Sequence, residues 1–211
     1  MTMTNTLHRQ GTEEELKEDY VIFATTARGI TREGSAPKIQ EFMRICLKHD
    51  PVNIGSSRQG NILQDDVEIH ELIANLGDGA GAAAVFTDLD TLQKVISELI
   101  EADLGVSINV SGLLDGVQQC CRGNGTERHS VEQSLGFWGS RDRLPEREIL
   151  AFNTLCGHGL VSFNLIRKMI EHVKMRRLTP REAAKIMGKC CECAVFNTVR
   201  AEHLLEKMLE T

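Results

Sequence analysis

The chain has 211 residues, 41% of them hydrophobic and 26% charged, which is typical of a folded protein with one large domain or two small ones. Its formal net charge of -6 argues against a dedicated nucleic-acid-binding domain, because such domains are usually strongly basic. No run approaches the roughly 18 apolar residues of a membrane-spanning helix, and the first ten residues lack the apolar stretch of a signal peptide. We therefore expect a cytoplasmic protein without membrane contact. The sequence does not indicate an oligomeric state.

After an N-terminal tail or helix over residues 1–18, short β-prone runs alternate with amphipathic segments of helical length. The expected strands are 20–25, 52–56, 82–87 and 106–111, and the expected helices are 36–48, 63–75, 89–103 and 113–121. This alternation is typical of a parallel sheet covered by helices. We predict an α/β domain over residues 19–140 with a parallel, or mixed, sheet. A weaker strand candidate follows at 129–136.

From residue 144 onward the pattern is helical, which predicts a helical, cysteine-containing domain over residues 144–211. Pro145 suits a helix start, Thr179 and Pro180 form an N-cap followed by a first-turn proline, and Asn197 suits the cap of a last helix. Gly188 disfavours one continuous helix across this region, because glycine in a helix interior costs about 1 kcal/mol relative to alanine. The cysteines near residue 190 are therefore expected in a loop between two helices.

The cysteines of this helical part are the main functional signal. Cys156 begins the glycine-containing run Cys156-Gly157-His158-Gly159, and Cys190 and Cys193 form a Cys-x-x-Cys pair. Thiolates spaced in this way in a reducing compartment indicate a metal site more often than disulfides. We expect Cys156, Cys190 and Cys193 to hold an iron–sulfur cluster. The alternatives are zinc held by these three residues with His158, and buried thiols without metal. The sequence leaves the metal, the fourth ligand and the role of Cys120 and Cys121 open.

Histidine and arginine residues complete the predicted site. His158 and His129 lie beside glycine-rich or polar connections and are candidates for proton transfer. In a parallel sheet the carboxyl ends of the strands gather ligands, which assigns Arg28, Arg58 and Ser111 to binding a small anionic molecule.

The sequence favours an iron–sulfur or other metal-dependent lyase or hydratase acting on a small anionic metabolite. One alternative is a metal- or redox-sensing regulatory protein with a Cys-ligated metal, whose partner would bind a basic run over residues 167–189. A second alternative is a cysteine-nucleophile enzyme using Cys156 and His158. A third is a globular protein whose cysteines only fill the core.

Overall fold

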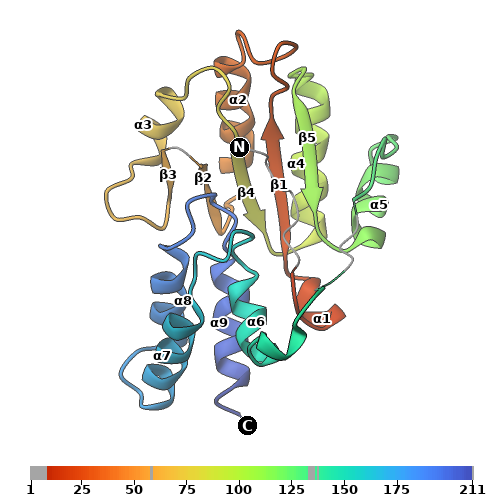
Figure 1. The fold of residues 1–211 in the computed structure, drawn as a ribbon. Helices are drawn as coiled ribbons and strands as arrows, with labels where there is room; N and C mark the ends of the chain where they lie inside the picture. Colours follow the sequence, from red (N-terminus) through yellow and green to blue (C-terminus); the bar gives the residue numbers. More distant parts are fainter. Residues whose placement is uncertain (1–8, 58, 133–135, 137, 211) are drawn as a thin grey trace.

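The structure is a computed structural model that describes residues 9–57, 59–132, 136 and 138–210. Five strands form one sheet in the order β3-β2-β4-β1-β5, and every neighbouring pair is antiparallel. Figure 1 shows the sheet with helices packed around it. The strands are β1 (Tyr20–Thr25), β2 (Asn53–Ser56), β3 (Gly60–Asn61), β4 (Ala82–Phe86) and β5 (Ser107–Ser111).

The prediction of a parallel sheet is wrong, although the four expected strands form close to the expected positions. Strands β1 and β2 are connected by α2 (Ala36–Leu47) and run in the same direction, and so do β4 and β5, which are connected by α4 (Leu89–Ala102). The strands of each pair are not neighbours in the sheet. Strand β4 lies between β1 and β2 and is antiparallel to both, and β1 lies in the same way between β4 and β5. The two β-α-β units are thus split and interleaved.

The central strands β1 and β4 are buried on both faces, which explains why they lack a clear alternation of apolar and polar residues. On one face, Ile22, Ala84 and their neighbours pack against α2 (Ala36–Leu47), α3 (Ile69–Ala74), α4 (Leu89–Ala102) and α5 (Leu114–Gly123). On the other face, Val21, Phe23 and Val85 pack against the C-terminal helices. Continuous apolar strands of this kind are typical of parallel sheets, and here they result from two helical layers on an antiparallel sheet.

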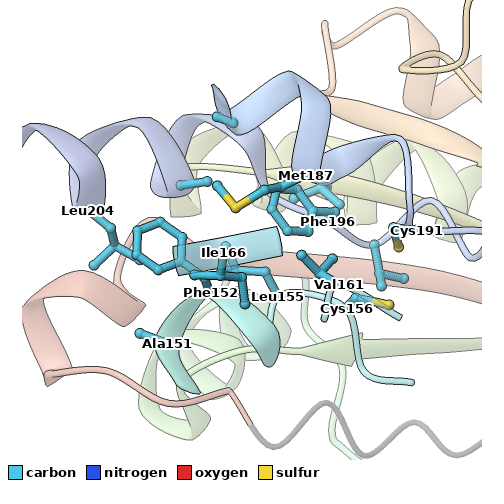
Figure 2. Packing of buried hydrophobic residues seen from close by; sticks show 14 of the residues in the cluster. Ala151, Phe152, Leu155, Cys156, Val161, Ile166, Met187, Cys191, Phe196 and Leu204 are labelled. Carbon is cyan, nitrogen blue, oxygen red and sulfur yellow. The ribbon is translucent and has the colours of Figure 1, made fainter. Parts of the chain in front are cut away.

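The C-terminal helices are α6 (Arg147–Asn153), α7 (Phe163–Lys174), α8 (Pro180–Gly188) and α9 (Thr198–Lys207). The predicted caps are confirmed: the Thr179 hydroxyl accepts from the Glu182 amide, and the Asn197 side chain accepts from the Arg200 amide. Helix α8 ends at Gly188, so the cysteines do lie in a loop. These helices share one core with the sheet (Figure 2). Whether residues 19–140 and 144–211 are separate domains stays a prediction.

Two predicted elements differ in the structure. The weak strand candidate at 129–136 forms no strand at residues 129–132 or 136, and residues 133–135 lie outside the described residues. The helix expected at 63–75 is shorter and forms α3, because turns follow β3 and continue into the start of that segment.

The N-terminal segment contains α1 (Glu13–Leu16) and joins the other layers through a buried ion-pair network. Asp19 pairs with Arg9 at 3.0 Å and with Arg200 of α9 at 2.6 Å, and the three side chains are at most 7% exposed. Within the described residues, no helix combines the length and apolar character needed to cross a membrane.

Candidate thiol and metal site

Two short turns in the C-terminal region have the same local design. The first runs from Cys156 to Leu160 after α6, and the second runs from Cys191 to Val195 between α8 and α9. In each turn the fourth residue has a left-handed backbone: Gly159 has a φ of 65° and Ala194 a φ of 59°. Alanine rarely adopts this conformation, because its Cβ then crowds the following carbonyl oxygen. The shared conformation is therefore a property of the two turns and not a consequence of glycine alone.

Each turn directs backbone amides toward the sulfur of its first residue. The amides of His158 and Leu160 point toward Cys156 and favour its thiolate, and the amides of Cys193 and Val195 do the same for Cys191. Successive amides in a turn of this kind form a concavity that binds anions, including iron–sulfur clusters and other anionic groups. Both sulfurs are thus placed where a negative charge is stabilised.

The two turns face each other, and equivalent residues are in contact. The Cys191 thiol forms a hydrogen bond with the Cys156 sulfur, and Figure 2 shows both side chains at one end of the core. The third residues of the turns also meet, since Cys193 Sγ lies 3.1 Å from His158 Nδ1. Cys156 and Cys191 are buried, whereas His158 is exposed and Cys193 is half-buried. The site therefore extends from the core to the surface.

Buried polar side chains hold both turns in place. Asn61 of β3 donates to the Cys191 carbonyl at 2.7 Å, and Asn53 of β2 donates to the Phe196 carbonyl at 3.1 Å. Arg9 donates to the Thr154 carbonyl at 3.4 Å and to the Val195 carbonyl at 2.7 Å. Arg9 thus joins the end of α6, directly before the first turn, to the second turn, and the asparagines attach the second turn and the residue after it to the sheet.

The thiols differ in their pKa values because of this arrangement. The hydrogen bond from Cys191, supported by the amides of its own turn, lowers the pKa of Cys156 against the opposing effect of burial. The same hydrogen bond, with burial, raises the pKa of Cys191. Burial, followed by the nearby Cys156, raises the pKa of Cys193 to about 11. Cys156 is therefore the thiolate of the group, and thiolate is the form that binds metals and attacks electrophiles.

The described residues contain no group of three or more His, Cys, Asp or Glu side chains that converge closely enough to hold a metal ion. The site instead consists of two contacting pairs, Cys156 with Cys191 and His158 with Cys193. Their chemistry suits a soft metal nonetheless, since three thiols and one imidazole match the ligands that zinc prefers. The backbone amides around the sulfurs of Cys156 and Cys191 also favour the thiolate form, which is the form that binds a metal.

Some predicted site residues come together in this site and others do not. Cys156, Cys193 and His158 belong to the two turns, whereas Cys190 precedes the second turn and packs, half-buried, against the core. Cys120 is buried in the core of the other sheet face and donates to the Leu89 carbonyl at 3.7 Å.

The predicted substrate residues do not gather at one edge, because the sheet is antiparallel. Arg28 is exposed beyond the end of β1, whereas Ser111 pairs with Val21 near the start of that strand. Arg58 lies outside the described residues. His129 is exposed and lines a cavity together with Ser111, away from the position expected for a parallel sheet.

Cys191 and Arg9 are not among the site residues predicted from the sequence. A signal for Cys191 was present, because Cys156-x-His158 and Cys191-x-Cys193 share the same spacing, with ligand-type residues two positions apart. Arg9 carries no local signal, since its partners at Thr154 and Val195 are distant in sequence.

Comparisons with protein-family models, curated proteins and solved structures found no match to this chain.

Proposed function

We propose that this chain is a metal-responsive regulatory protein in which Cys156, His158, Cys191 and Cys193 hold a soft metal ion or an iron–sulfur cluster. The observation that carries the proposal is the pairing of two equivalent turns, in which first residue meets first residue and third residue meets third residue. A bound metal would cross-link the turn after α6 to the turn before α9. All seven cysteines are free, which suits a reducing compartment such as the cytoplasm.

Four protein donors favour a regulatory or structural role over catalysis. Structural metal sites are closed by protein ligands, whereas catalytic sites keep one position open for water or substrate. Occupancy of a closed site changes how firmly the two turns are joined, and therefore how firmly the helical layer is held. The exposed basic side chains of α7 and α8, among them Lys168, Arg181 and Lys185, offer a surface for an acidic partner.

A metal-dependent lyase or hydratase is the second candidate, and the exposure of His158 favours it. If only the three cysteines hold an iron–sulfur cluster, one iron stays available to a substrate, and His158 at the surface is free to move a proton. The two candidates differ in one respect: His158 is a ligand in the regulatory protein and a proton carrier in the lyase.

A His158→Gln variant separates the two candidates. Wild-type and variant proteins are purified without oxygen, and iron, sulfide and zinc are measured per chain together with the absorption spectrum. The regulatory proposal predicts stoichiometric metal in the wild type and a marked loss in the variant. Full metal content in the variant would favour the lyase. A wild-type protein that binds neither iron nor zinc under these conditions would contradict both.

A further inference from the structure

The connection between α7 and α8 carries a compact group of four cations. Lys174 ends α7, Arg176 and Arg177 lie in the connection, and Arg181 lies in the first turn of α8. All four residues are exposed, and Figure 1 shows the connection at the outer end of the helical layer, away from the sheet. We name these four residues the basic corner.

Acidic side chains of the chain do not neutralise the basic corner. Within the described parts of the chain, none of its four residues forms an ion pair, whereas Arg167 and Lys189, farther along the same helices, each pair with a carboxylate. The acidic residue next to the corner, Glu182, accepts hydrogen bonds from the amide and the hydroxyl of Thr179, both at 2.8 Å. Residues 163–189 contain eight Lys or Arg and two Glu. The corner therefore presents excess positive charge to solvent.

Arg176 occupies a backbone position that favours glycine. Its φ is 55°, its amide donates to the Val173 carbonyl at 2.9 Å, and the Arg177 amide donates to the His172 carbonyl at 2.8 Å. These two hydrogen bonds define a common helix end in which the left-handed residue is usually glycine. Any other side chain at this position costs about 1–2 kcal/mol. A side chain that lowers stability and forms no ion pair within the fold favours a role in binding.

The composition of the corner favours a protein partner over a nucleic acid. Met175, between Lys174 and Arg176, is 52% exposed, and methionine and arginine are both enriched in protein interfaces. Residues 164–189 contain no Phe, Tyr or Trp on which a base could stack. A long polyanion would also extend over the acidic remainder of the chain, whose formal net charge is -6 in spite of the cations of α7 and α8.

We propose that the basic corner binds an acidic segment of a protein partner, with carboxylates at its arginines and an apolar side chain at Met175. The planar guanidinium group of arginine suits this role, because it binds a carboxylate through two parallel hydrogen bonds. In giving the regulatory protein its partner, the inference rests on the function proposed above. The contact itself lies outside the cysteine turns and can be measured with or without metal.

Fluorescence anisotropy at low salt tests the proposal with three labelled probes. These are a short peptide that repeats Glu-Glu-Leu, the same peptide with Gln in place of Glu, and an oligothymidylate of equal length. We expect the Glu peptide to bind to the wild-type protein and the Gln peptide to bind roughly tenfold more weakly, because several charged pairs are lost. Binding of the Glu peptide should weaken as salt is added.

Arg176→Gly separates binding from folding. Glycine suits the φ of 55°, so the variant should be at least as stable as the wild type in denaturant unfolding, yet bind the Glu peptide roughly threefold more weakly. Arg177→Gln should weaken binding by a similar factor. Lys94→Gln is the matched control, since Lys94 is an exposed cation of α4 on the other face of the sheet, and it should keep the wild-type affinity.

The proposal is overturned if the wild-type protein does not bind the Glu peptide, if the Gln peptide binds as tightly, or if both arginine variants keep the wild-type affinity. Tighter binding of the oligothymidylate than of the Glu peptide would assign the corner to nucleic acid and overturn it as well. Metal content, measured on the same samples, keeps the two proposals apart. A wild-type protein that binds the Glu peptide but no metal would contradict only the metal site, and a metal-loaded protein that does not bind the peptide would contradict only the basic corner.

Discussion

Cys156 shows how a single residue acquires its chemistry from its turn. A buried thiol normally resists ionisation, and Cys46 follows this rule, since burial raises its pKa. Cys156 is buried as well, yet the Cys191 thiol and two amides of its own turn lower its pKa to about 6. Hydrogen bonds to the charged form outweigh the loss of water here.

The ultraviolet absorbance of thiolates tests this assignment in the metal-free protein. One thiolate should form near pH 6 in the wild type, and Cys156→Ser should abolish this step. Cys191→Ala should move the step to higher pH, because it removes the main donor to the Cys156 sulfur. If thiolates form only near the ordinary cysteine pKa of about 8.5, Cys156 is an ordinary thiol.

This pKa also predicts how stability depends on pH. Because the pKa is lower in the folded state, the contribution of Cys156 is complete above the unfolded pKa of about 8.5 and is lost as the pH falls through about 6. Denaturant unfolding of the wild type and of Cys156→Ser should therefore diverge most at alkaline pH.

Gly159 offers a residue-scale test of the turn itself. A Cβ at this position would meet only the Asn153 side chain, at 3.8 Å, so that any cost of Gly159→Ala comes from its φ of 65°. We expect a loss of about 1–2 kcal/mol in the free energy of unfolding. Gly77→Ala is the matched control, since nothing lies near its added Cβ and its φ is not left-handed. Equal effects of the two substitutions would contradict the assigned conformation.

At the scale of elements, the sequence predicted which segments form strands and helices better than how they are arranged. Local periodicity and capping residues such as Thr179 and Asn197 placed the helix ends. The order of strands in the sheet depends on contacts between distant segments, such as β1 with β4, which local patterns do not contain. The alternation of strand and helix segments along the chain favoured the wrong choice of a parallel sheet.

The same limit applies to the candidate site. The spacing of Cys156, His158 and Cys193 indicated ligand-type chemistry from the sequence alone. The choice of Cys191 over Cys190 depends on the direction in which each side chain leaves the loop, and this direction is set by contacts with β3 and with Arg9. The anion site was expected at the ends of parallel strands, and its premise failed together with the parallel sheet.

Strand β3 was not predicted, and it has a specific role in holding the second turn. Asn61 donates to the Cys191 carbonyl at 2.7 Å in a buried setting. Asn61→Ala should destabilise the protein by about 1–3 kcal/mol, because it leaves a buried acceptor without its donor. Gln59→Ala, which removes an exposed hydrogen bond to the Asn75 carbonyl, should change stability far less. Denaturant unfolding of both variants would show a similar small change if β3 does not anchor the turn.

At the scale of the whole molecule, the network of Asp19, Arg9 and Arg200 joins the N-terminal segment, the start of β1 and α9. Asp19→Asn leaves two buried guanidinium groups without their carboxylate and should lower the free energy of unfolding by about 3–5 kcal/mol. Asp65→Asn removes one partner of the exposed pair with Lys189 and should cost at most about 1 kcal/mol. Comparable losses in the two variants would show that the buried network does not hold the layers together.

The central claim is that two equivalent turns supply the metal ligands of this protein, with Cys191 and not Cys190 as the ligand from the second loop. The most direct test is the metal and sulfide content of Cys190→Ser and Cys191→Ser proteins purified side by side without oxygen. The account predicts that Cys190→Ser keeps the wild-type content and that Cys191→Ser loses it. Loss in Cys190→Ser with retention in Cys191→Ser, or equal content in both, would contradict the claim.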